Sequence, residues 1–369
     1  MAQHAAHSLG TTPVSHTSKP RITWVDITKG VAMFLVFFGH LGTQWFPALA
    51  GTLAAIYTFH MPLFFVASGF FFHARYTFGQ LAKKRAMMLL VPYYIFSVLA
   101  LAKPVAQLVS PSLYKDGGDG VGGVIGSIVT IVFAQGNAGL WFLWAVFTGQ
   151  LLLWVIVRLT RNRIPVLTVL LCAFIVADFA FQLVSWRNQL PFQLGKIFES
   201  TAYMGFGYVL GQTQDLRSLQ NRETALPRVL VMVGSAVVFV LFLWLQTSND
   251  TVCSIMPLDW LVEFVTTIAA IAAVTMLCTL VPQWGWLQTV GRDSLVFYGV
   301  NDFMLKIVKF SVFSVGGVTA VQWPLAAQLF AGLFVVVGAM LLSALVNLVV
   351  QRHARWAVGD FSGLHGSSK

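Results

Sequence analysis

Charged side chains are scarce in this sequence of 369 residues. Only 10% of the residues are Asp, Glu, Lys or Arg, whereas 57% are hydrophobic and the mean hydropathy is +0.77. Soluble globular domains carry about 25% charged residues, so the composition excludes that class. It indicates a polytopic membrane protein whose main partner is the lipid bilayer.

Cysteine is scarce, and neither a signal-peptide pattern nor internal repeats are found. The three cysteines, Cys172, Cys253 and Cys278, lie in separate apolar stretches without metal-ligand spacing, so we expect neither a disulfide framework nor a metal site. Residues 1–20 lack the basic start and apolar middle of a signal peptide and are expected to form a disordered cytoplasmic tail. Without internal repeats, one integral membrane domain is expected over 21–356, followed by a short cytoplasmic tail over 357–369.

Ten apolar runs are long enough, or nearly so, to cross a bilayer. An eleventh segment, Val121–Phe133, is short and interrupted by glycine, which favours a re-entrant or interfacial position. The runs cover residues 26–46, 52–73, 87–109, 139–158, 164–185, 197–212, 227–246, 259–281, 292–315 and 324–350.

The loop charges test this count, because Lys and Arg accumulate on the cytoplasmic side of a membrane. The net charge of +10 is concentrated in short loops near residues 75–85, 158–163 and 217–228 and at the C-terminal end. These loops fall on one side if the N-terminus is cytoplasmic and Val121–Phe133 does not cross. The predicted fold is therefore an all-α helical membrane bundle of about ten transmembrane helices with both termini cytoplasmic, and no nucleic-acid partner is expected.

Two histidines and a lysine enter the first two runs. Lys29 and His40 are eleven residues apart, which places them on one helix face, and His60 reaches a similar depth on the antiparallel second helix. A buried histidine can belong to a structural polar network, but two at one depth favour proton transfer near neutral pH. Metal binding is weaker because no Glu or Cys is well placed beside them.

Two neighbouring features support a shaped site. Pro62 follows His60 closely, and a proline inside a membrane helix frees a carbonyl and often borders a cavity. A basic cluster then occurs at Arg75, Lys83, Lys84 and Arg85. The cluster can be an orientation signal, but it equally suits the phosphates of a coenzyme.

Several motifs together resemble the membrane acyltransferase 3 family, in particular the branch similar to fucose 4-O-acetylases. The resemblance is strongest over the first hundred residues, and Asn301 stands where a histidine is frequent in the family. The motifs are RITWVDITKGVAMFLVFFGH (21–40), FHMPLFFVASGFFF (59–72), KKRAMMLLVPYY (83–94), GLWFLWAVF (139–147) and VGRDSLVFYGVN (290–301).

The resemblance implies an acyl-CoA donor, usually acetyl-CoA, as co-substrate, and no permanently bound cofactor. It also implies a carbohydrate hydroxyl as acceptor. By motif position, His40 is expected to be the principal catalytic residue, with Lys29 and His60 beside it, and the basic cluster at Arg75, Lys83, Lys84 and Arg85 is expected to face the coenzyme. Trp141, Arg292, Ser294 and Tyr298 are the expected substrate-binding residues.

The resulting hypothesis is a membrane-bound O-acetyltransferase of the bacterial inner membrane. It would modify a surface or exported polysaccharide or its lipid-linked precursor, working with polysaccharide biosynthesis or export machinery. Direct transfer is simpler than an acyl-enzyme, although an acyl-histidine stays open. The alternative is a secondary transporter or flippase that uses intramembrane His, Lys and Arg as a proton relay.

Three further acids, Asp178, Glu199 and Glu263, lie in or beside apolar runs. Each either binds the acceptor or pairs with a polar group of a neighbouring helix, and the sequence favours pairing.

Overall fold

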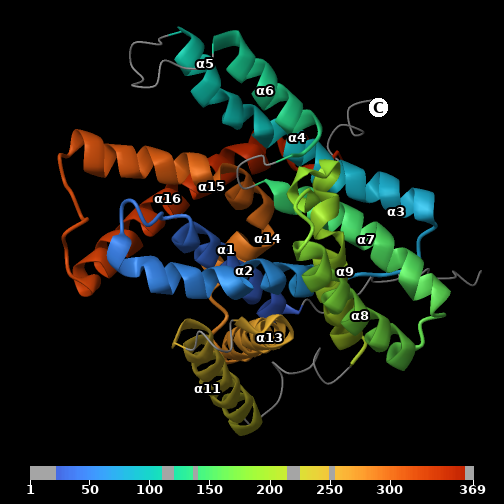
Figure 1. Cartoon of the computed structure of the whole chain (residues 1–369). Coiled ribbons are helices and arrows are strands. Elements are labelled where there is room, and N and C mark those ends of the chain that lie inside the picture. The colour runs from blue at the N-terminus through green and yellow to red at the C-terminus, as the bar shows by residue number, and fades with distance from the viewer. Residues whose placement is uncertain (1–21, 110–119, 136–139, 214–224, 249–253, 362–369) are drawn as a thin grey trace, which may run out of the picture.

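The computed structural model describes residues 22–109, 120–135, 140–213, 225–248 and 254–361. Every regular element within these ranges is a helix (Figure 1), so the predicted all-α class is confirmed. Lipid offers backbone groups no hydrogen-bond partners, and apolar segments of this length therefore satisfy them as helices. The predicted tail at 1–20 and Cys253 lie outside the described residues.

Each of the ten predicted runs falls on one helix or on a short series of helices. The single helices are α1 (Thr23–Gly39), α2 (Ala50–Phe70), α7 (Trp141–Leu159), α8 (Ile164–Gln182), α9 (Ile197–Gly211), α11 (Leu226–Ser248), α13 (Met256–Leu280) and α16 (Leu325–His353). The third run comprises a π-helical turn (Ala86–Leu90), α4 (Val91–Ser97), a 3-10 turn (Val98–Leu101) and α5 (Ala102–Val109), and α3 (Phe78–Arg85) precedes it. The ninth comprises α15 (Ser294–Lys309) and a π-helical turn (Phe310–Val315), and it begins at the last residue of α14 (Gly285–Arg292).

Seven of the described helical segments are long and apolar enough to cross a membrane. The helices α1, α9 and α15 have only 17, 15 and 16 residues. At about 1.5 Å per residue they fall short of a ~30 Å hydrocarbon core. The multi-pass membrane architecture is thus established, whereas the count of ten spans and the cytoplasmic termini stay predictions.

The short segment predicted at Val121–Phe133 forms α6 (Gly120–Val132), a helix of 13 residues that returns alongside α5 (Figure 1). The Tyr93 hydroxyl donates to the Ile131 carbonyl at 3.0 Å, so α6 ends beside the middle of the Phe78–Val109 segment. The helix therefore covers about 20 Å, less than a full crossing.

The far end of α7 shows which loops share a side. The Arg158 side chain donates to the Ala74 carbonyl at 2.9 Å, and the Trp154 indole donates to the Tyr76 carbonyl at 2.9 Å. The loop after Arg158 therefore lies on the same side as the loop after α2. The loop-charge model of the sequence requires this arrangement.

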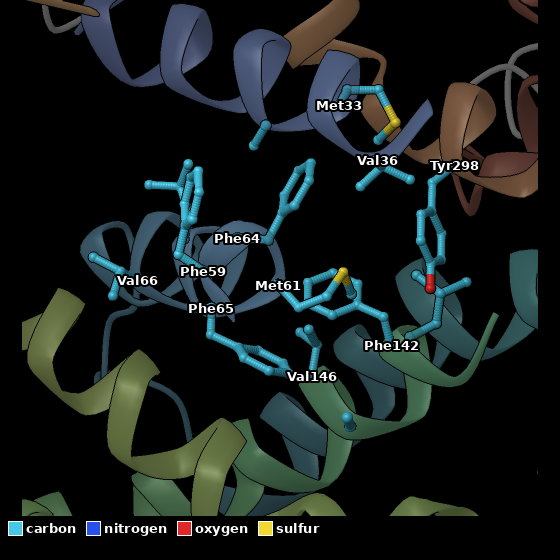
Figure 2. Close-up of a cluster of buried hydrophobic side chains, with 14 of the residues drawn as sticks. Met33, Val36, Phe59, Met61, Phe64, Phe65, Val66, Phe142, Val146 and Tyr298 are labelled. Carbon is cyan, nitrogen blue, oxygen red and sulfur yellow. The ribbon is translucent and has the colours of Figure 1, made fainter. Parts of the chain in front are cut away.

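The helices α1 and α2 form the centre of the bundle (Figure 1). Around them lie α9 with α7 and α8, the pair α11 and α13, and the group α14, α15 and α16. Figure 2 shows buried side chains from four helices meeting there: Met33 and Val36 from α1, Phe59, Met61, Phe64, Phe65 and Val66 from α2, Phe142 and Val146 from α7, and Tyr298 from α15. The helices that carry Lys29, His40 and His60 thus pack against one another through a buried apolar cluster.

Glycines allow α9 to lie unusually close to α2. A Cβ atom at Gly207 would overlap the Val66 carbonyl, and one at Gly211 would overlap the Phe70 carbonyl. The spacing Gly207 to Gly211 is the small-xxx-small pattern that lets membrane helices approach backbone to backbone.

The segment predicted as a C-terminal tail begins in a packed turn. A 3-10 turn at Arg355–Val358 contacts α16 and α4, and Ala357 is buried. Residues 362–369 lie outside the described residues.

Candidate active site

The first cavity, called here the histidine cavity, contains both histidines selected from the sequence. It has a volume of about 290 Å³ and is lined in part by His40, His60, Trp141 and Tyr298. Ligand pockets in proteins commonly measure ~300–1,000 Å³, so the space suits one small polar group such as a sugar ring.

Tyr57 connects the two histidines. Its ring meets His60 edge to face at 5.2 Å and His40 at 6.2 Å between centroids. Its hydroxyl donates to the Gly39 carbonyl at 3.0 Å, at the end of α1. The predicted approach of His40 and His60 on consecutive helices is therefore present in the structure.

The buried His60 ring has a defined orientation. Its Nδ1 lies 2.9 Å from the Ile56 carbonyl oxygen, one turn earlier on α2. A carbonyl oxygen only accepts hydrogen bonds, so Nδ1 carries the proton and Nε2 keeps its lone pair. Neutral His60 thus offers a hydrogen-bond acceptor to the cavity that it lines.

Pro62 shapes this wall without ending α2. Because proline lacks an N–H group, the Thr58 carbonyl loses its partner four residues later in the helix. The Thr267 hydroxyl of α13 donates to that carbonyl at 3.1 Å. Thr58, Pro62 and Thr267 all line the histidine cavity, as the expected shaped pocket requires.

Lys309 holds the end of α1 and was not selected from the sequence. Its ammonium donates to the carbonyls of His40 and Leu41, each at 3.3 Å, and its side chain is buried. A cation is favourable at a helix C-terminus because it satisfies the last carbonyls and the dipole. Lysine near the end of an apolar run is also an ordinary interfacial residue, so no separate signal for this contact exists in the sequence.

The histidine cavity is also lined by charged residues. Arg187 pairs with Asp178 at 2.8 Å and also donates to the Gly195 carbonyl at 2.6 Å. Lys196 pairs with Glu199 at 3.0 Å and lies over the Trp141 ring. Asp178, Glu199 and also Glu263 line the histidine cavity, so pairing within the protein explains only two of the three acids.

The second cavity, called here the arginine cavity, measures about 320 Å³. Its lining includes Lys29, Arg85, Arg292 and Ser294, and one carboxylate, Asp293. The Nε atom of Arg85 is buried and has no hydrogen-bond partner among the described residues. Buried donors are nearly always satisfied, so this guanidinium is suited to an anionic ligand.

Close packing of α1 against α14 brings two of these cations together. A Cβ atom at Gly30 would crowd Leu287, and one at Gly291 would overlap the Asp26 carbonyl. Lys29 and Arg292 are the immediate neighbours of these glycines, and both reach the arginine cavity. The side chain of Arg292 pairs with Asp293 at 3.2 Å.

Tyr298 lines both cavities. Its hydroxyl is hydrogen-bonded to the backbone of Phe142, in the first turn of α7, and it points toward that helix in Figure 2. The first four N–H groups of a helix lack partners within the helix, so the Phe142 amide is available to donate. Tyr298 therefore borders both the cavity of the histidine pair and the cavity of the cation cluster.

The structure regroups the other residues selected from the sequence. Arg292 and Ser294, predicted with Trp141 as substrate-binding residues, flank the break between α14 and α15 and line the arginine cavity with Lys29 and Arg85. Trp141 is on the other cavity, at the start of α7. Asn301 is buried on α15 and lines neither cavity.

The basic cluster is also divided. Arg85 alone of its four members lines the arginine cavity, while Arg75 borders a third cavity with Arg158 and Arg161. Lys83 and Lys84 are exposed on α3. Consecutive helical residues point about 100° apart, so the adjacent cations at 83, 84 and 85 cannot all face one cavity.

Lys84 and Arg75 instead surround Tyr76. Both donate to its hydroxyl, at 3.0 Å and 3.1 Å, which favours the phenolate and lowers the pKa of Tyr76 to about 8. We expect one tyrosine to ionise near pH 8 in an ultraviolet titration, where its phenolate appears as the pH rises. Tyr76→Phe should remove that transition, and Lys84→Met should move it upward. A wild-type titration with no tyrosine ionising below pH 9 would contradict this contact.

Comparison with known families decides the class of protein. A family model described as an acyltransferase domain matches residues 22–345, which include the whole lining of the histidine cavity and all of the arginine cavity except Gln351 and Val358. The chain belongs to the acyltransferase 3 family. The membership predicted from the sequence motifs is therefore confirmed.

Among curated proteins, this chain is similar to nodulation protein NolL of Mesorhizobium japonicum. The two are 32% identical over 168 residues, which cover 41% of this chain and 40% of NolL. The match thus spans less than half the length of that relative. No solved structure gives a significant match.

Proposed function

We propose that the protein transfers an acyl group, in the first instance acetyl, from cytosolic acyl-CoA to a carbohydrate hydroxyl on the other side of the bacterial inner membrane. The acceptor would be a surface or exported polysaccharide or its lipid-linked precursor. The observation that supports this most is that the histidine cavity and the arginine cavity share Tyr298. A donor and an acceptor bound one in each cavity would meet there.

The arginine cavity suits the donor. Three cations, Lys29, Arg85 and Arg292, face it against the single carboxylate Asp293. Coenzyme A carries several phosphates, and charge-assisted hydrogen bonds from guanidinium groups are strong and directional. The loops on this side of the bundle also carry Arg75 and Arg158, as cytoplasmic loops do.

The histidine cavity suits the acceptor and the chemistry. A ring nitrogen of His40 takes the proton of the acceptor hydroxyl while that oxygen attacks the thioester carbon. The tetrahedral intermediate then collapses, the C–S bond breaks, and the coenzyme leaves as a thiolate that receives the proton. Direct transfer of this kind needs no acyl-enzyme, and His60 and Tyr57 hold the acceptor beside His40.

A substitution of Arg85 tests whether the arginine cavity binds the acyl-CoA donor. Arg85→Met should weaken acetyl-CoA binding by about 10-fold to 100-fold, because a hydrogen bond to a charged group contributes about 1.5–3 kcal/mol. Binding of labelled acetyl-CoA to the purified protein measures this effect. Lys83→Met is the matched control, since Lys83 lies two residues away, is exposed and faces neither cavity. Equal affinities for the two variants would argue against a coenzyme in the arginine cavity.

A further inference from the structure

Glu263 lies on the wall of the histidine cavity, eight residues into α13. It forms no hydrogen bond or ion pair with any residue that the structure describes. Ionisable groups at membrane depth are costly and usually functional. Its neighbour one turn later, Thr267, faces the same cavity but is engaged with the Thr58 carbonyl.

The other charges of this cavity are already matched. Arg187 is held by Asp178 at 2.8 Å, and Lys196 is held by Glu199 at 3.0 Å. Both cations are therefore engaged within the protein. Glu263 is the remaining charge, so the cavity as a whole presents one more carboxylate than cations.

The histidine cavity thus has more carboxylates than Lys and Arg side chains, whereas the arginine cavity has more cations than carboxylates. A phosphate or carboxylate group of a ligand in the histidine cavity would be repelled by the Glu263 carboxylate. It would gain little from Arg187 and Lys196, because both are already paired. Sugar hydroxyls or an amino group would instead donate hydrogen bonds to the Glu263 carboxylate, which accepts from several donors at once.

From these contacts we propose that Glu263 is a specificity-determining residue that binds the acceptor and selects sugars without a negative charge. The inference rests on the proposed function, because it concerns the acceptor of the same reaction. It goes further by naming the acceptor class, a neutral or amino sugar, and by excluding uronic and other acidic sugars as preferred acceptors.

The test uses three matched probes with labelled acetyl-CoA and the full-length protein in proteoliposomes. The probes are a methyl hexoside, its 6-deoxy analogue and its uronate, which differ only at C6. We expect kcat/KM for a neutral probe to exceed that for the uronate by about 10-fold or more. The 6-deoxy sugar ensures that the difference does not arise from loss of a reacting 6-hydroxyl.

Glu263→Gln should raise the acceptor KM by about 10-fold and reduce the preference against the uronate, while the KM for acetyl-CoA stays unchanged. Asp360→Asn is the control, because Asp360 is paired with Arg355 after the end of α16 and lines neither cavity. A wild-type protein that prefers the uronate, or a Glu263→Gln variant with unchanged selectivity, would overturn the inference.

Glycans from cells with and without the chain provide the second readout. Mass spectrometry should place the added acetyl group on a neutral or amino sugar, and an acetylated uronic acid would overturn the inference while leaving the acetyltransferase function intact. If neither the probes nor any glycan gains acetyl, the proposed function fails and Glu263 loses this role with it.

Discussion

Replacing His40 with alanine is expected to lower kcat for acyl transfer by about 10²-fold to 10⁴-fold, the usual contribution of a general base. His40 ends α1, lines the histidine cavity and is held by Lys309 through its backbone carbonyl. No change in the KM for acetyl-CoA is expected, because the arginine cavity does not include His40. Steady-state kinetics with labelled acetyl-CoA separate the two parameters.

Two comparisons make the His40 result specific. His353→Ala changes an exposed histidine at the end of α16 and should leave kcat at the wild-type value. Added imidazole should restore part of the activity of His40→Ala, since the truncated side chain leaves room in the cavity. A variant that keeps wild-type kcat would remove His40 from the mechanism.

Replacing Gly207 with valine is expected to cause a large loss of stability. The new Cβ atom would overlap the Val66 carbonyl, which is backbone and cannot rotate away. The helices α2 and α9 would have to separate, and overpacking of this kind costs about 1–3 kcal/mol or more. A thermal melt of the detergent-solubilised protein should show a lower midpoint and less folded protein.

Gly234→Val controls for the cost of a β-branched residue in a membrane helix. Gly234 is exposed on α11, and an added Cβ atom there meets no atom within 4 Å. Its melting midpoint should stay near that of the wild type. Similar losses for both variants would mean that contact between α2 and α9 does not limit stability.

The helical runs could be predicted from the sequence because their signal is local. A bilayer requires about 20 apolar residues per crossing, and each run carries that pattern within itself. The approach of His40 and His60 also followed from short-range facts, namely helix direction and the number of residues from each end. The proximity of the two histidines could therefore be predicted without knowledge of how the helices pack.

The division of the site into two cavities could not be predicted in this way. It depends on the helix break at Asp293, which places Arg292 and Ser294 at the junction of α14 and α15. It also depends on which face of each helix packs against its neighbours. Lys309 reaches the end of α1 across 269 residues of sequence, and Thr267 reaches Thr58 across 209. Contacts between residues so far apart in the chain have no characteristic spacing in the sequence. The sequence also does not show that Asp178 and Glu199 are paired, which is what distinguishes Glu263 from them.

The sidedness of the reaction tests the central claim most directly. The protein is reconstituted in vesicles with one known orientation, labelled acetyl-CoA is supplied on one side only, and a sugar acceptor is supplied on the other. The two-cavity arrangement predicts acetylated sugar only when acetyl-CoA faces the side of Arg75 and Arg158 and the acceptor faces the opposite side. Product that forms only when both substrates are on the same side would contradict it.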